Sequence, residues 1–125
     1  MNNKYIKGVV FERNLVEKFS ADGFVAMRVA GSGRYSELLP DVLIMKNNLV
    51  IAIQCKKTKS DKIYLSKDVE NFKKFKEIAN IKCIFAVKFL KKDVRFYDLA
   101  KIDKNIDINE PFEIYEDIVN HFQKI

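Results

Sequence analysis

Apolar and polar residues alternate along the chain with two different periods. Apolar residues recur every three to four positions in segments 8–21, 67–79 and 111–122, which predicts a helix in each segment. We expect Ser66 to cap the second helix and Pro111 to lie in the first turn of the third. Asp22-Gly23 is expected to end the first helix.

Shorter apolar runs between these helices predict strands. They lie at residues 24–29, 41–45, 49–54, 81–88 and 94–97, with a short extended piece at 63–65 and a polar loop at 31–39. Asn47-Asn48 has the composition of a hairpin turn, so the second and third strands should pair antiparallel. The order helix, three strands, helix, two strands, helix predicts an α/β fold whose mixed sheet is covered by helices on both faces.

The composition favours a globular, cytoplasmic protein. A chain of 125 residues is expected to form one domain, residues 1–125. It is 48% hydrophobic and 32% charged, so it has enough apolar residues to build a core. No apolar run approaches the roughly 18 residues of a membrane span, and the first residues have no signal-peptide pattern.

The net charge of +6 and the sequence pI near 9.3 favour a polyanionic partner. Lysine-rich surfaces also occur without such a partner, so charge alone does not decide for nucleic acid. Cys55 and Cys83 are the only cysteines and His121 is the only histidine. We expect both cysteines to be reduced thiols in or near the core, because two distant cysteines without other ligands make no zinc site.

A candidate catalytic pattern follows Pro40. Asp41 begins one predicted strand, and Gln54 and Lys56 belong to the next. Residues two apart on a strand point to the same face, so Gln54 and Lys56 project together, and the hairpin can bring them beside Asp41. Oxygen ligands next to a lysine suit Mg²⁺ and a phosphate group. Lys56 would orient a metal-activated water or neutralise charge on the phosphate.

This pattern resembles the signature of the PD-(D/E)xK nucleases, which have the restriction-endonuclease-like fold. In that signature, Pro-Asp is followed by a strand that ends in Glu-x-Lys. Three further segments resemble archaeal Holliday junction resolvases: Lys7-Gly8 with Phe11-Glu12-Arg13, then residues 28–33, then residues 63–67. The order and spacing fit that family over roughly residues 5–103, whereas residues 105–125 match less distinctly. Four pieces in the right order are more specific than any single piece.

The resemblance implies a role for individual residues. Glu12, Asp41 and Gln54 would hold Mg²⁺, with Mn²⁺ as an alternative ion, and Lys56 would assist the attacking water. Ser32 would lie near the scissile phosphate and complete the catalytic set. Contacts to backbone phosphates, which position DNA without reading its sequence, would come from Lys7, Arg13, Arg34 and Lys57.

Gln54 departs from the motif, in which most members have glutamate. An amide offers a divalent ion only a dipole, so metal affinity should be lower, although the amide oxygen can still coordinate. Mrr-like restriction nucleases resemble this chain in having Gln-x-Lys there. We therefore interpret Gln54 as a natural variant, and an introduced Glu→Gln change is the alternative interpretation.

Each of these residues also has a purely structural interpretation. Glu12 and Arg13 could form the solvated side of an amphipathic helix, and Asp41 could be a turn residue. Gln54 and Lys56 could be the outward positions of a half-exposed strand, and Ser32 an ordinary loop residue. These interpretations together require several coincidences, so the sequence favours the nuclease.

We therefore expect a cytoplasmic, archaeal-type endonuclease without membrane segments that resolves four-way junction DNA. A C2 homodimer would match the near two-fold symmetry of the junction. Phe85, Val87, Phe89 and Tyr97 are candidates for the dimer face, or belong to the monomer core. Two alternatives stay open: a catalytically weakened nuclease-fold protein that binds branched DNA, and an Mrr-like nuclease acting on duplex DNA. The lack of an extra specificity domain argues against the second.

Overall fold

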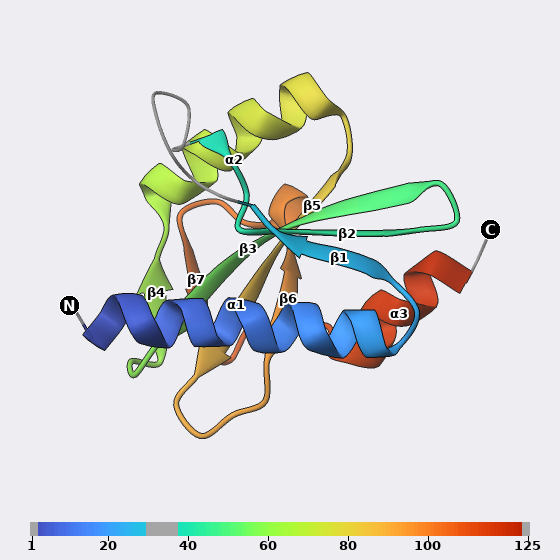
Figure 1. Ribbon diagram of the computed structural model, residues 1–125. Coiled ribbons are helices and arrows are strands. Elements are labelled where there is room, and N and C mark those ends of the chain that lie inside the picture. The colour runs from blue at the N-terminus through green and yellow to red at the C-terminus, as the bar shows by residue number, and fades with distance from the viewer. Residues whose placement is uncertain (1–2, 30–37, 124–125) are drawn as a thin grey trace.

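The structure is a computed structural model that describes residues 3–29 and 38–123. The elements in chain order are α1 (Asn3–Ala21), β1 (Val25–Arg28), β2 (Val42–Lys46), β3 (Leu49–Thr58), β4 (Lys62–Tyr64), α2 (Ser66–Ala79), β5 (Lys82–Phe89), β6 (Arg95–Asp98), the short 3₁₀ helix η2 (Leu99–Lys101), β7 (Asn105–Asp107) and α3 (Tyr115–Gln123). The predicted α/β class with a mixed sheet is confirmed (Figure 1). None of the described helices is long and apolar enough to cross a membrane.

Five strands form the main sheet in the order β1-β2-β3-β5-β6. Only β3 and β5 run parallel, since the chain crosses over through β4 and α2 between them; the other neighbours are antiparallel. Asn47 and Asn48 both have positive φ, 53° and 68°, as a two-residue hairpin turn of the favoured twist requires. The predicted antiparallel hairpin is therefore confirmed. β4 and β7 form a separate two-stranded sheet.

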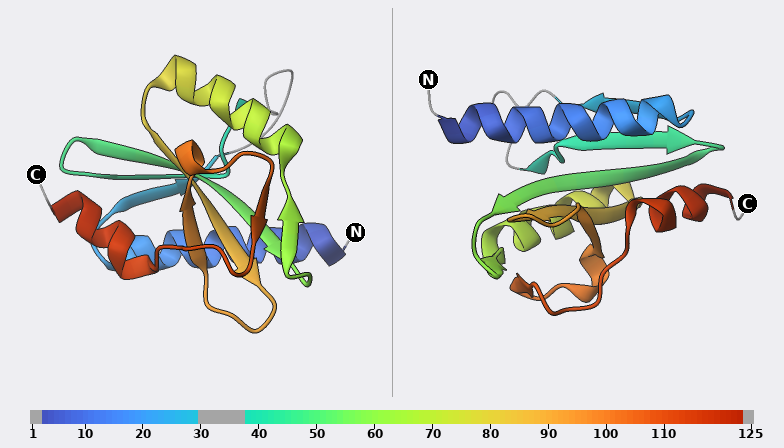
Figure 2. Two further views of the ribbon diagram at one scale, coloured as in Figure 1. Left: turned by 180° about the vertical axis from the view of Figure 1, so that it is seen from behind. Right: turned by 90° about the horizontal axis from the view of Figure 1, so that it is seen from below.

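Helices pack on both faces of the main sheet, as predicted. Phe11, Leu15 and Phe19 of α1, spaced four residues apart, join α3 residues in one apolar cluster with Ile51 and Ile53 of β3. The opposite face carries a second cluster with Val69 and Phe72 of α2. Figure 2 shows α1 and α2 on opposite sides of the sheet. Alternate residues of β3 therefore point towards different helices.

The two neighbours of β3 cover different lengths of it. β2 pairs with residues 49–53 only, whereas β5 pairs with residues 51–58. From Gln54 onward, no described strand pairs with the β2-side edge of β3. β3 also continues to Thr58, beyond its predicted end at residue 54, because β5 pairs with the whole basic run.

The predicted N-cap of α2 is wrong. The helix already includes Ser66, and the capping position is Leu65, whose side chain makes no cap hydrogen bond. Leu65 is fully buried, and its backbone N–H donates to the Lys104 carbonyl while its own carbonyl accepts from Val69. Burial of Leu65 therefore sets the start of the helix, and a side-chain cap does not.

The predicted start of α3 at Pro111 is also wrong. Phe96 and Glu113 exchange two backbone hydrogen bonds, of 2.8 and 2.9 Å, so the chain stays extended there. The helix begins at Tyr115, and the Asp117 carboxylate accepts from the Ile114 N–H at its start. Because of this pairing with β6, the helix begins about one turn later than predicted. The strand β7, which pairs with β4, was not predicted, because its residues show no strong apolar pattern in the sequence.

The residues considered for a dimer face belong to the monomer core. Phe85, Val87 and Phe89 of β5 are fully buried, and Tyr97 of β6 is 4% exposed. All four lie in the apolar cluster beneath α2. Cys83 is buried in the same cluster and Cys55 is partly buried, and both are free thiols, as expected.

Candidate active site at the free edge of β3

Asp41 lies where β2 begins, at the point beyond which no described strand pairs with this edge of β3, called the free edge below. Its backbone N–H donates to the Ile53 carbonyl (3.0 Å), and its carbonyl accepts from the Val29 N–H (2.8 Å). One carboxylate oxygen, Oδ2, accepts from the backbone N–H of Cys55 at 2.8 Å. The aspartate thus satisfies a backbone donor that β2 does not reach. The turn-residue interpretation does not account for this side-chain contact.

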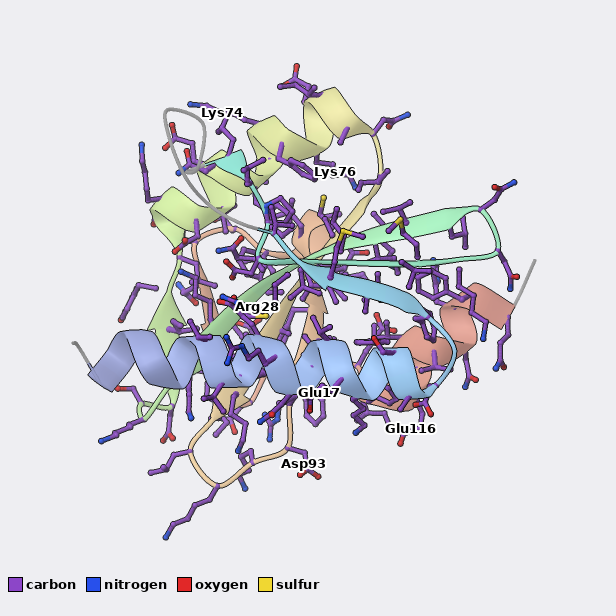
Figure 3. All side chains as sticks on the ribbon, viewed as in Figure 1. Glu17, Arg28, Lys74, Lys76, Asp93 and Glu116 are labelled. Atoms are coloured by element: carbon purple, nitrogen blue, oxygen red, sulfur yellow. The ribbon has the colours of Figure 1, made fainter. Side chains whose placement is uncertain are left out.

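Glu12 approaches the same edge from α1. Its carboxylate Oε1 pairs with the Arg28 Nε at 3.1 Å, with the glutamate side chain 19% exposed. Figure 3 labels Arg28 beside the middle of α1. Phe11 and Leu15, on the adjacent part of the helix, are buried, so the core packing of α1 fixes the position of Glu12. Arg28 has no role in the sequence-based assignment, although it belongs to the segment that carried the family resemblance.

Gln54 and Lys56 lie on the same face of β3, as their spacing predicted, and α2 covers this face. Lys56 Nζ forms an ion pair with Asp68 Oδ1 of α2 at 2.8 Å. Gln54 and Asp68 line one small hollow of about 20 Å³, together with Leu38, Leu39, Asn71 and Phe72. Asp68 was not predicted as a site residue. An aspartate in the first turn of a helix is common for structural reasons, so its position in the sequence did not mark it as a site residue.

The charges at this edge affect Asp41 directly. Burial raises the pKa of the Asp41 carboxyl from 3.8 to about 6, while the hydrogen bond from Cys55 lowers it. The nearby carboxylates of Glu12 and Asp68 also raise this pKa, and the Lys56 ammonium lowers it. The structure therefore brings Glu12, Lys56 and Asp68 within electrostatic reach of Asp41.

Cys55 is part of the site without being a nucleophile. Burial raises the pKa of its thiol well above the ordinary 9.0, and the negative charges of Asp41 and Glu12 raise it further. The thiol therefore stays protonated near neutral pH. Its contribution to the site is the backbone N–H that holds Asp41.

The remaining predicted site residues are only partly described. Arg13 on α1 and Lys57 on β3 are exposed, as contacts to DNA would require. Ser32 and Arg34 lie outside the described residues, and the side chain of Lys7 does as well. Within the described part of the chain, no group of three or more His, Cys, Asp or Glu side chains is arranged to hold a metal ion by itself.

The mixed sheet and its polar free edge place the protein in the restriction-endonuclease-like class of nuclease folds. The family model described as archaeal Holliday junction resolvase (Hjc) matches residues 3–122. This match covers nearly the whole chain, so the protein belongs to the archaeal Holliday junction resolvase family. The family suggested by the sequence motifs is thereby confirmed.

Individual relatives agree with this assignment. A crossover junction endodeoxyribonuclease Hjc of Archaeoglobus fulgidus is 35% identical over 108 residues, covering 83% of this chain and 79% of that protein. The Hjc protein of Sulfolobus acidocaldarius is 33% identical over 108 residues, covering 82% and 75%. The 1.6 Å structure of the Archaeoglobus fulgidus Hjc, a Holliday junction resolvase, matches with a TM-score of 0.69 at 29% identity, covering 80% of this chain and 88% of that chain.

Proposed function

We propose that the protein is a metal-dependent, structure-selective endonuclease that resolves four-way DNA junctions by paired hydrolysis of phosphodiester bonds. One observation carries this proposal: in a chain of the junction-resolvase family, Asp41, Glu12 and Lys56 gather at the free edge of β3. An isolated acidic cluster would not specify a reaction, but carboxylates beside a lysine suit metal-assisted attack on a phosphate.

Mg²⁺ is the ion we propose, with Mn²⁺ as a substitute. The donors suit a hard divalent cation, since Glu12 and Asp41 offer carboxylates and Gln54 offers an amide oxygen. Burial is the main cause of the raised pKa of Asp41, and a bound divalent cation would offset this cost of holding the carboxylate in its charged form. When bound, the ion supplies Lewis-acid activation of water and stabilises charge on the phosphate.

The protein's own residues position the reacting groups. The hydrogen bond from Cys55 keeps the Asp41 carboxylate directed along the β3 edge. Lys56 offers a cation for the charge that develops on the phosphate, or orients the attacking water. Arg28 holds Glu12 at the same edge through its ion pair. Ser32 is proposed to lie near the scissile phosphate.

The DNA backbone is proposed to contact basic residues on both sides of this edge. Arg13 of α1 and Lys57 of β3 are exposed, and Lys7 and Arg34 belong to the same proposed set. Such contacts recognise the shape and charge of the junction arms, so binding should weaken steeply with salt. We propose that the enzyme acts on junction DNA in the cytoplasm.

A C2 homodimer is proposed because paired nicks need two sites related by a two-fold axis. The outer face of β1 is the favoured surface: Val25 is 59% and Met27 is 41% exposed. Their cross-strand partners Met45 and Leu43 of β2 share that face and are also partly exposed. Sedimentation of a Met27→Lys variant tests this assignment. The variant should be monomeric at concentrations where the parent chain is dimeric.

Nicking of a labelled four-way junction in Mg²⁺ or Mn²⁺, beside a linear duplex of the same sequence, tests the function. We expect paired nicks on the junction only, and an Asp41→Asn variant that still binds the junction but does not cut it. Cutting of both substrates at equal rates would instead support a duplex nuclease. A chain that neither binds nor cuts the junction would contradict the proposal.

Gln54 favours a second candidate, a nuclease-fold protein that binds branched DNA with weakened catalysis. An amide at this position leaves the divalent ion with one negative charge fewer than glutamate would supply. The same assay separates the two functions: tight junction binding without nicking, followed by nicking in a Gln54→Glu variant, would establish the binding protein.

A further inference from the structure

Asp68 is the ion-pair partner of Lys56 among the described residues. It belongs to the first turn of α2, and its Oδ1 lies 2.8 Å from Lys56 Nζ. The two side chains are 34% and 26% exposed, so the pair is neither buried nor fully solvated. No motif that led to the proposed function includes Asp68. Its side chain nevertheless contacts Lys56, the lysine to which the proposed function gives a role in catalysis.

Other acceptors near Lys56 are less suited to hold its ammonium. Gln54 lies on the same face of β3 two residues away, but its side chain is neutral. The Asp41 carboxylate accepts the hydrogen bond from Cys55 through Oδ2 and is the proposed ligand of the divalent ion. Asp68 and Gln54 line the same small hollow between β3 and α2, so Asp68 places a carboxylate beside the position where the motif usually has one.

We infer that Asp68 is a positioning residue, whose carboxylate holds the Lys56 ammonium at the active edge because position 54 carries no charge. This inference rests on the proposed function, in which Lys56 acts on the scissile phosphate. Asp68 acts through Lys56 and does not contact DNA in this role. Its negative charge would repel a phosphate, so its removal should not weaken junction binding.

This role predicts a specific split between rate and affinity. With Asp68→Asn, the nicking rate at saturating junction should fall about 10- to 100-fold, because a misplaced catalytic group loses its orientation. Junction affinity should stay equal or become tighter. A second change, Gln54→Glu, offers Lys56 a carboxylate on the same strand face and should restore most of the rate in the double variant.

The experiment compares the parent chain, Asp68→Asn, Gln54→Glu, the double variant and a control, Glu70→Gln. All nicking is measured at saturating Mg²⁺, so that a gain in metal affinity at position 54 is not counted as recovery. The control removes the same charge two residues further along α2, where Glu70 pairs outward with Lys74 at 3.6 Å; Figure 3 labels Lys74 on the outer side of the helix. Single-turnover nicking and metal-free junction binding are measured for each. Thermal melting of each variant excludes unfolding as a cause.

A readout independent of nicking follows the ion pair itself. Trace acetylation with acetic anhydride, quantified by mass spectrometry, should label Lys56 several-fold faster in Asp68→Asn than in the parent, with Lys91 as internal reference. Unchanged labelling would overturn the ion pair. Faster labelling with an unchanged nicking rate, or a lower rate that Gln54→Glu does not restore, would overturn the positioning role.

Failure of the proposed function gives a different result. If the parent chain does not nick any junction, the proposed function is contradicted whatever the Asp68→Asn variant does. Because the inference assigns Asp68 a task in that reaction, such a result would overturn the positioning role too, while the labelling would still report whether the ion pair exists. Full support requires faster labelling, a lower rate, unweakened binding and recovery in the double variant.

Discussion

The two halves of β3 are both extended, but one half belongs to the core and the other carries candidate site residues. Ile51, Ala52 and Ile53 are buried, with β2 on one side and β5 on the other. Beyond them, Gln54 and Lys56 are only partly buried, and β5 is the one described strand that pairs with them. The difference arises because β2 is five residues long and β3 is ten. Because β3 extends beyond the end of β2, its second half has a polar edge, while the buried first half fixes its position in the sheet.

The largest effect should come from the buried half. Ile51→Ala removes a side chain that is 1% exposed and should lower the free energy of unfolding by about 3–4 kcal/mol. Urea unfolding measures this change. The single-turnover rate per folded molecule should remain that of the parent chain. A loss of less than about 1 kcal/mol would mean that this half does not anchor the sheet.

The next effect belongs to the polar half. Lys56→Met should lower the nicking rate at saturating junction about 100-fold, because it removes the cation that is proposed to act on the phosphate. Its melting temperature should change little, since a partly exposed ion pair contributes only about 0–1 kcal/mol. Lys74→Met, on the exposed side of α2, serves as the matched control. An equal loss in both variants would show a general effect of charge.

Asp41, at the boundary between the halves, should make stability depend on pH. Its pKa is raised from 3.8 to about 6 in the folded chain, so folding favours the protonated carboxyl. The resulting stability is fully present below pH 3.8 and is lost as pH rises through about 6. Without divalent ions, Asp41→Asn should therefore be more stable than the parent at pH 8, on the order of 2 kcal/mol.

Urea unfolding of the two chains between pH 4 and pH 8 measures this difference. The gap should close towards low pH, where both side chains are neutral. Addition of Mg²⁺ at pH 8 should also narrow it, because the ion stabilises only the parent chain by binding its charged carboxylate. A gap that is independent of pH would show that Asp41 is not the group responsible.

The smallest effect should come from Gln54→Glu. A third carboxylate adds a full negative charge for the ion, so the Mg²⁺ concentration that gives half-maximal nicking should fall about tenfold. Titration of Mg²⁺ at saturating junction measures this shift. Gln54→Ala, which also removes the amide oxygen, should move it in the opposite direction. If both variants match the parent, position 54 does not contact the ion.

The sequence predicted most of the fold because its signals were local. The apolar spacing of α1 and the Asn47-Asn48 turn depend on neighbouring residues alone, and the helix and the hairpin are both confirmed. The predicted start of the first helix at Gly8 is wrong, however, since α1 already begins at Asn3. The other errors came from distant contacts. Ser66 does not cap α2 because Leu65 is buried against the core, and α3 starts late because Glu113 pairs with Phe96.

The site was predictable to the extent that a motif marks it. Asp41 and Lys56 follow from the spacing of Pro-Asp and Gln-x-Lys, and Glu12 follows from the family resemblance. Asp68 could not be found in this way, because its contact with Lys56 depends on how α2 packs across β3. The ion pair of Glu12 with Arg28, sixteen residues apart in the sequence, likewise requires the folded sheet.

The three hydrogen bonds of Asp41 bear on how the site responds to scarce metal. Two fix its backbone, to Val29 and Ile53, and the third fixes its carboxylate. The conformational entropy of this side chain is therefore lost during folding and not when an ion arrives. Under the proposed function, a metal ion would enter and leave while Asp41 keeps its orientation, and the site would not need to be rebuilt between one junction and the next.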